Sequence, residues 1–300
     1  MLSRRANLVG MLVAVGLGLL GSPRAAPAAS VASRIVVVAA ENFYGDIVGQ
    51  IGGDHVAVTN IITDPNVDPH EYVTNARDGA AIANARLVIQ NGIGYDDFMN
   101  RLMAASPSPQ RKVIVVAELT GHKKGDNLHL WYDPPTIPKV AQAILEALVQ
   151  IDPGNATSFR NWYRAFRSSL LPLNQAIASI KAQYGGTPVA FTEPVFGYMA
   201  AALGLNVLTP IEFQKAIEEG EDPPASALAK MEDQLKTRQV KVLLYNTQTV
   251  SPITTRVREL AKRVGIPVVG VSETEPPGKS FQQWMLAQLE TLRAALIRGN

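Results

Sequence analysis

Short apolar runs that alternate with helical segments constrain the fold of this chain more than any other feature. Eight runs, four in each half, are short, continuous and rich in β-branched residues, which is typical of parallel strands buried on both faces. Helical patterns lie between them. This alternation predicts an α/β fold of two Rossmann-like lobes, each a four-stranded parallel sheet with helices on both faces. The runs lie at residues 35–40, 56–62, 87–90, 113–116, 189–192, 207–208, 242–245 and 268–271.

A long segment with few helix breakers separates the two halves. Residues 155–184 contain one proline, Pro172, and no glycine, and their apolar residues recur at helical spacing from Trp162 to Ile180. Such a helix would be about 45 Å long, which is too long for a crossover within a compact sheet. We therefore expect one backbone helix that joins the lobes and bends near Pro172.

The first residues have the parts of an export signal. Arg4 and Arg5 form a charged start, residues 8–20 are apolar and uncharged, and residues 26–28 offer a small-x-small cleavage site. The apolar run is shorter than the ~20 residues of a membrane span, which disfavours an uncleaved anchor. We expect cleavage before Ala29 and a soluble periplasmic protein.

The expected domain boundaries follow from these three observations. They are 1–28 for the signal peptide, 29–153 for the N-terminal lobe, 154–185 for the linker helix and 186–300 for the C-terminal lobe.

Charge and cysteine content exclude several classes of function. Three leader arginines contribute to the net charge of +2, so the chain without them carries −1 and has no basic excess for nucleic acid. The sequence contains no cysteine, which excludes disulfides, thiolate metal ligands and a lipid-modified cysteine.

Four loops that follow predicted strands carry a potential metal ligand. His70 and His129 lie in such loops of the first half, and Glu193 and Glu275 in such loops of the second half. In parallel sheets, bound ligands gather beyond the carboxyl ends of the strands. Two imidazoles and two carboxylates form a nitrogen–oxygen site that suits Zn²⁺ or Mn²⁺. The sequence therefore predicts one site for a divalent transition metal.

Three short motifs resemble one protein family. They are DPHEY at 68–72, HLWYDP at 129–134 and EPVFGY at 193–198. These motifs, and the mature chain as a whole, resemble the periplasmic metal-binding subunits of zinc and manganese ABC importers. The resemblance implies two α/β lobes joined by a rigid helix, one metal in the cleft between them, and delivery of the metal to a membrane permease.

The resemblance also implies roles for individual residues. His70 and His129 match the first two ligands, and Glu193 matches the third, which is a glutamate in manganese-type members and usually a histidine in zinc-type members. Glu275 stands where the family usually has an aspartate, and Glu273 is the alternative for this position. The loop before His129 is short and basic, unlike the long histidine-rich loop of many zinc-type members.

A metal site of this composition also fits an enzyme. An exported metal-dependent hydrolase would use the same two histidines, with Glu193 or Glu275 as a general base. The sequence has neither a His-Glu-x-x-His motif nor a Gly-x-Ser-x-Gly motif. We therefore expect a monomeric binding protein that is not an enzyme and binds no organic substrate, with the hydrolase as the alternative.

Overall fold

Two parallel sheets, whose carboxyl ends carry the predicted ligand loops, form the framework of the protein. The computed structural model describes residues 34–66 and 68–299. The predicted signal peptide and its cleavage site lie outside the described residues. Both sheets belong to one compact unit of the chain, which is defined by its internal contacts.

The first sheet is entirely parallel, with strand order β2-β1-β3-β4. The chain order reverses between β1 and β3, so this is the switch point at which parallel sheets commonly bind ligands. The elements of this half are β1 (Ile35–Glu41), α1 (Asn42–Gly52), β2 (Val56–Ile62), α2 (Ala76–Asn84), β3 (Leu87–Gln90), α3 (Phe98–Ala105), β4 (Lys112–Val115), α4 (Val116–Thr120) and α5 (Thr136–Ile151).

The second sheet repeats this arrangement with the order β6-β5-β7-β8. The prediction of two four-stranded parallel sheets is therefore confirmed. The elements of this half are β5 (Pro188–Phe191), α8 (Gly197–Ala202), β6 (Asn206–Val207), α9 (Ile211–Glu218), α10 (Ala225–Lys236), β7 (Val242–Asn246), α11 (Pro252–Arg263), β8 (Val268–Val271) and α12 (Phe281–Gly299).

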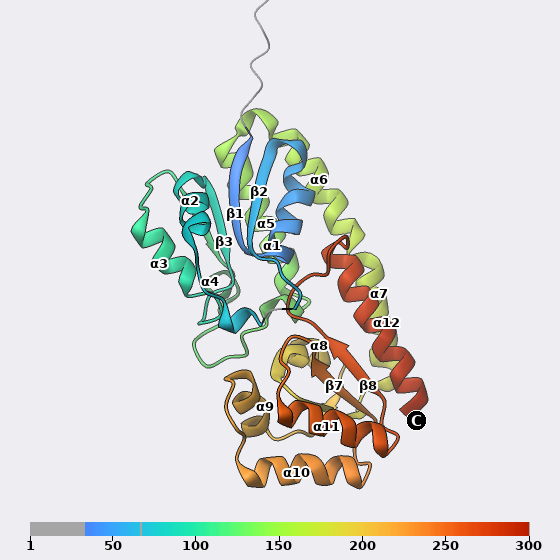
Figure 1. Cartoon of the computed structure of the whole chain (residues 1–300). Helices are drawn as coiled ribbons and strands as arrows, with labels where there is room; N and C mark the ends of the chain where they lie inside the picture. The colour runs from blue at the N-terminus through green and yellow to red at the C-terminus, as the bar shows by residue number, and fades with distance from the viewer. Residues whose placement is uncertain (1–33, 67, 300) are drawn as a thin grey trace, which may run out of the picture. The chain divides into compact units, whose positions relative to one another are not determined.

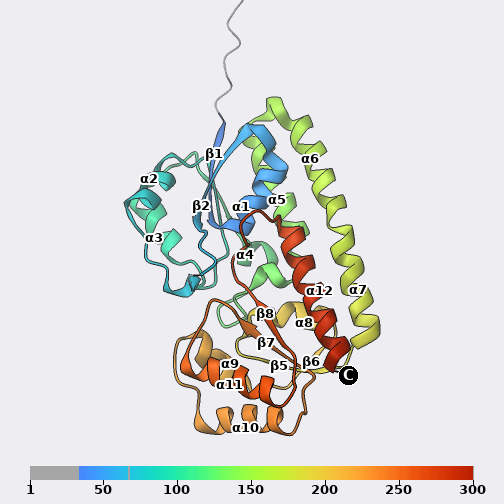
Figure 2. The ribbon, with the colours of Figure 1, turned by 45° about the vertical axis from the view of Figure 1, so that its right-hand side comes forward.

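The linker consists of two helices placed end to end, where we predicted one. Helix α6 (Ala156–Ser169) and helix α7 (Leu171–Tyr184) meet at Leu170. Pro172 lies in the first turn of α7, where its missing N–H costs no intrahelical hydrogen bond. Figures 1 and 2 show both helices along one side of the two sheets, with α12 beside α7. The boundaries of 29–153 and 186–300 for the two lobes stay a prediction.

Two short helices were not predicted. Residues 116–120 form α4, where we predicted the last residue of a strand followed by a loop, because five residues are too few to show helical periodicity. Helix α9 has only eight residues, and its sequence signal is the spacing of Phe213 and Ile217, which are both buried. This second omission matters, because α9 contributes to the site.

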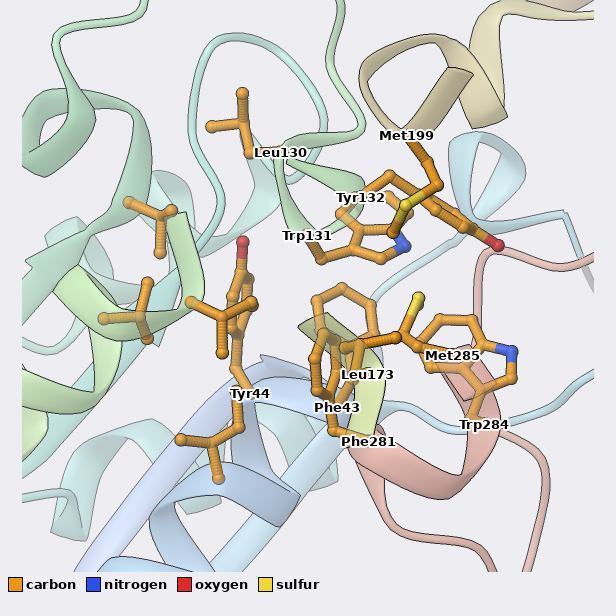
Figure 3. Close-up of a cluster of buried hydrophobic side chains, with 14 of the residues drawn as sticks. Phe43, Tyr44, Leu130, Trp131, Tyr132, Leu173, Met199, Phe281, Trp284 and Met285 are labelled. Atoms are coloured by element: carbon orange, nitrogen blue, oxygen red, sulfur yellow. The ribbon is translucent and has the colours of Figure 1, made fainter. Parts of the chain in front are cut away.

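One apolar cluster extends through both lobes (Figure 3). The ring of Phe43 on α1 lies 4.6 Å from that of Trp131 and 5.8 Å from that of Trp284 on α12. Leu173 of the linker and Met199 of α8 belong to the same cluster. The lobes therefore share a continuous core, and separating them would expose large aromatic side chains to water.

Among the residues that the structure describes, no helix combines the length and the apolar character needed to cross a bilayer.

Candidate metal centre

His70 is presented by a short turn that follows β2. The 3₁₀ helix Pro69–Glu71 has Asp68 as its N-cap, and Asp68 Oδ1 accepts a hydrogen bond of 2.9 Å from the backbone N–H of His70. The cap and Pro69 fix the backbone here, because the cap satisfies a free N–H and proline presets its own φ. The side chain of His70 is 19% exposed, and its buried Nε2 atom has no hydrogen-bond partner.

His129 is held more tightly, by a single asparagine. Asn127 Oδ1 accepts hydrogen bonds from the backbone N–H of His129 at 3.0 Å and from its ring Nδ1 at 2.7 Å. A carbonyl oxygen can only accept, so Nδ1 is the donor in this contact, and Nε2 is the ring nitrogen left to face Glu273 or a metal. His129 is fully buried, and Nε2 has no hydrogen-bond partner. This is the arrangement that prepares an imidazole to bind a metal through Nε2.

Glu193 enters the centre from the second lobe. It follows β5 and is the N-cap of the 3₁₀ helix Pro194–Phe196. Its Oε2 accepts hydrogen bonds from Asn246 Nδ2 at 3.0 Å and from Thr249 Oγ1 at 3.3 Å, while its Oε1 is buried without a partner. Burial, together with the negative charges of Glu273 and Asp68, raises the pKa of Glu193 to about 8.

Glu273, which follows β8, contacts both histidines. Its Oε2 lies 3.5 Å from His70 Nε2 and 3.3 Å from His129 Nε2, and it accepts a hydrogen bond of 2.9 Å from the Tyr95 hydroxyl. Its Oε1 accepts a hydrogen bond of 2.6 Å from Asn246 Nδ2. Burial alone would raise the pKa of Glu273, but its contacts with His129 and His70 hold that pKa well below its usual value.

The same contact changes the protonation of His70. Burial alone would lower the pKa of His70, but the close contact with Glu273 and its negative charge outweigh burial and raise the pKa to about 9. An incoming cation would therefore replace a proton in the centre.

The loop that places Tyr95 depends on left-handed backbone. Gly92, Ile93 and Gly94 have φ values of 86°, 51° and 107°. Glycine adopts such angles without steric cost. Asp96 closes the loop by accepting hydrogen bonds from the backbone N–H groups of Asn91 at 2.6 Å and Gly92 at 2.8 Å.

The distances from Glu273 to the two imidazole nitrogens fit a metal site. Ligand atoms bound tetrahedrally at about 2.1 Å from Zn²⁺ are roughly 3.4 Å apart. The two Nε2 atoms lie 3.5 Å and 3.3 Å from the same oxygen of Glu273. His70, Asp68 and Glu273 form one group of potential ligands within 4.8 Å of one another, and His70, His129 and Glu218 form another. The chemistry that this geometry supports is the capture of a cation.

Comparison with known proteins agrees with this geometry. Residues 37–295 match the family described as ZnuA, the periplasmic component A of the zinc-uptake complex. The chain belongs to this family.

Individual relatives of the family are distant from this chain. The zinc-binding protein TroA of Treponema pallidum is 26% identical over 155 residues, which cover 48% of this chain and 49% of TroA. The metal ABC transporter substrate-binding lipoprotein ScbA of Streptococcus cristatus is 23% identical over 312 residues, with coverage of 96% and 97%. For TroA and three further curated relatives, the matched part spans 49% to 59% of the relative's own length.

Two solved structures share the fold of this chain. The periplasmic zinc-binding protein TroA superimposes with a TM-score of 0.75 at 20% identity, over 88% of this chain and 99% of TroA. The solute-binding protein FpvC of Pseudomonas aeruginosa, in complex with Mn²⁺, has a TM-score of 0.73 at 23% identity, over 89% and 100% of the two chains.

Glu275 is not brought to the two imidazoles. Its backbone N–H donates to Asn42 Oδ1 at 3.0 Å, and its carbonyl accepts from Asn42 Nδ2 at 2.7 Å, so it is tied to α1. Burial and the nearby charge of Asp46 raise the pKa of Glu275 to about 9. Of the two glutamates in this loop, Glu273, the alternative to Glu275, is the one that contacts both imidazoles.

A bend in the loop explains the exchange of the two glutamates. Gln248 Oε1 accepts hydrogen bonds from the consecutive backbone N–H groups of Glu273 at 2.6 Å and Thr274 at 3.1 Å. In a regular strand, successive N–H groups point to opposite sides, so this shared acceptor marks an irregular backbone. The side chains at 273 and 275 consequently point to different surroundings.

Glu218, at the end of α9, was not among the ligands predicted from the sequence. Its Oε1 lies 3.6 Å from His129 Nδ1, and its side chain is 12% exposed. It also lines a cavity of about 550 Å³, together with Asn127 and Pro194. The only sequence signal for this residue is the acidic run that begins with it.

The other histidines of the chain lie apart from these groups of ligands. His122 contacts Asp126 and the Tyr198 hydroxyl, each at 3.3 Å. His55 packs against Phe159 and Trp162, with ring centroids 5.7 Å and 5.6 Å away.

Proposed function

We propose that this protein is the periplasmic solute-binding protein of a metal ABC importer, which captures Zn²⁺ or Mn²⁺ and delivers it to a membrane permease. The observation that supports this most directly is the contact of two buried imidazole nitrogens with one oxygen of Glu273. Burying a polar atom without a hydrogen bond costs free energy. Buried nitrogen atoms without such a bond therefore indicate that a ligand binds to them.

The proposed metal ligands are His70, His129, Glu193 and Glu273. Each offers a buried donor atom, and Asn246 links the two carboxylates by donating to both at 3.0 Å and 2.6 Å. Glu273 replaces Glu275 in this set. The donors are compatible with Zn²⁺ or Mn²⁺, because nitrogen and oxygen ligands suit both ions.

The proposed role is transport and not catalysis. Four protein ligands leave little space for the open coordination position that a catalytic metal keeps. Family membership supports this, since the family consists of solute-binding proteins. In the described residues, no observation favours the hydrolase alternative.

The remaining parts of the proposal concern the context of the protein. We infer that residues 1–28 are a cleaved signal peptide, that the exported protein is a monomer, and that it binds one metal ion per chain. The similarity to ScbA, a metal ABC transporter substrate-binding lipoprotein, supports a permease as the partner.

Thermal unfolding with and without metal tests the proposal. A ligand at about 100 times its Kd stabilises the native state by about 2.7 kcal/mol, which corresponds to a rise in Tm of about 5–10 °C in a chain of this size. We expect Zn²⁺ or Mn²⁺ to produce this rise in the wild type and not in the double variant His70→Ala, His129→Ala.

The matched control is His122→Ala, which removes a histidine outside the proposed site and should keep the full shift in Tm. A double variant that still gains the same stability as the wild type would show that the metal binds elsewhere. Elemental analysis of protein purified without chelator then identifies the metal that is bound.

A further inference from the structure

Glu218 approaches the metal centre from a different element than the four proposed ligands. It is the last residue of α9, in the second lobe, whereas Glu193 and Glu273 lie in loops that follow β5 and β8. One donor atom each of His70, His129 and Glu218 lies within 4.8 Å of the other two. This juxtaposition is long-range in sequence and does not result from local helix geometry.

The buried oxygen of Glu218 lacks a hydrogen-bond partner. Glu218 Oε1 lies 3.6 Å from His129 Nδ1, but that nitrogen already donates to Asn127 Oδ1 at 2.7 Å. A role in orienting His129 is therefore filled by Asn127. A buried carboxylate oxygen that is not needed to orient the imidazole is available to a cation.

An independent observation points to the same ligand. His129 is fully buried and belongs to the same group of potential ligands as Glu218, and its Nε2 has no hydrogen-bond partner. Two neighbouring side chains thus each hold a buried donor atom without a hydrogen bond. A shared metal ion would satisfy both.

Glu218 is also more exposed to solvent than Glu193 and Glu273 are. Glu193 and Glu273 are 3% and 0% exposed, whereas the side chain of Glu218 is 12% exposed and lines the cavity of about 550 Å³ between the 124–128 segment and α9. Its carboxylate can therefore reach a bound metal from the cavity side without displacing the buried donors.

We propose that Glu218 is a fifth protein ligand, which raises the coordination number above four and favours Mn²⁺ relative to Zn²⁺. This inference rests on the proposed function. Zn²⁺ is satisfied by four ligands near tetrahedral geometry, whereas Mn²⁺ prefers more oxygen donors and up to six ligands. An additional carboxylate thus contributes more to the binding of Mn²⁺.

The test compares two adjacent glutamates. Glu218→Gln removes the charged donor and keeps the shape of the side chain. Glu219→Gln is the matched control, because Glu219 lines the same cavity but belongs to neither group of potential ligands. Dissociation constants for Mn²⁺ and for Zn²⁺ are measured separately by competition with a chelating dye, and circular dichroism checks that both variants are folded.

We expect Glu218→Gln to weaken Mn²⁺ binding by about tenfold or more, as for other changes around bound metals, and Zn²⁺ binding by less than about threefold. Glu219→Gln should change neither by more than about threefold. Equal effects of the two variants on Mn²⁺, or equal weakening of both metals by Glu218→Gln, would overturn the inference. A wild-type protein that binds neither metal would instead overturn the proposed function itself.

Discussion

At the scale of single residues, Asn127 prepares the centre before any metal arrives. Its Oδ1 fixes the protonated nitrogen of His129, and its Nδ2 donates to the carbonyl of Pro194 at 2.7 Å, next to Glu193. One side chain therefore orients a ligand of the first lobe and connects it to the ligand loop of the second lobe. A Cβ atom on Gly197 would lie 2.7 Å from this Nδ2, so the absence of a side chain at 197 leaves space for the connection.

Replacing this asparagine should weaken metal binding without removing a ligand. We expect Asn127→Ala to lower the affinity for Zn²⁺ or Mn²⁺ by about 10–100-fold, because the ring of His129 loses the partner that fixes its tautomer. Isothermal titration measures the affinity. Asn100→Ala, which removes an exposed asparagine that accepts a hydrogen bond of 3.0 Å from Gln90 Nε2, serves as the control and should bind metal as the wild type does. Equal affinity in both variants would contradict this role.

At the scale of elements, the end of β1 and the loop after β3 each contribute one buried carboxyl group to a neighbouring pair. Glu41 and Asp96 are both 0% exposed. Burial, together with the charge and hydrogen bond of Asp96, raises the pKa of Glu41 well above its usual value. Asp96 in turn binds the backbone N–H groups that shape the loop carrying Tyr95. The fold therefore retains a proton at the switch point of the first sheet.

This retained proton makes stability depend on pH. Above the ordinary pKa of 4.5, the unfolded chain loses the proton of Glu41 while the folded protein keeps it, so the free energy of unfolding falls as pH rises. Glu41→Gln keeps a neutral donor to Asp96. Between pH 5 and pH 8, the free energy of unfolding of the Glu41→Gln variant should therefore fall by less than that of the wild type, with a difference of about 1 kcal/mol or more.

Urea denaturation of metal-free protein at each pH measures this difference. Glu290→Gln, which neutralises an exposed glutamate of α12, should follow the wild-type curve. Parallel pH profiles for Glu41→Gln and the wild type would refute the retained proton.

At the scale of the whole molecule, the shared core limits how far the lobes can separate. The aromatic contacts of Phe43 with Trp131 and Trp284 connect α1, the ligand loop of His129 and α12 (Figure 3). Polar contacts reinforce them, since Asp46 on α1 accepts a hydrogen bond of 2.9 Å from the backbone N–H of Phe281. Opening the cleft widely would expose these rings and break this bond.

We therefore expect metal release to involve local changes and only small lobe movements. Small-angle scattering of metal-free and metal-bound protein should give radii of gyration that differ by less than about 1 Å, as for complexes whose backbones move little on binding. A larger difference would mean that the shared core separates during release.

The sequence by itself determined the architecture and indicated which loops form the proposed centre. Short β-branched runs and helical spacing are local patterns, and they predicted both sheets and the loops that carry His70, His129 and Glu193. Two glutamates of one loop remained as alternatives because both precede the same Pro-Pro-Gly turn.

Only the tertiary structure decided which carboxylates face the imidazoles. Gln248, from another loop, bends the backbone so that Glu273 contacts both histidines and Glu275 binds against α1. Helix α9 was not predicted, and it brings Glu218 to within 3.6 Å of His129 Nδ1, although the two residues are far apart in the chain. Local patterns specify elements, but the direction of a loop side chain depends on contacts between distant segments, which no local pattern contains.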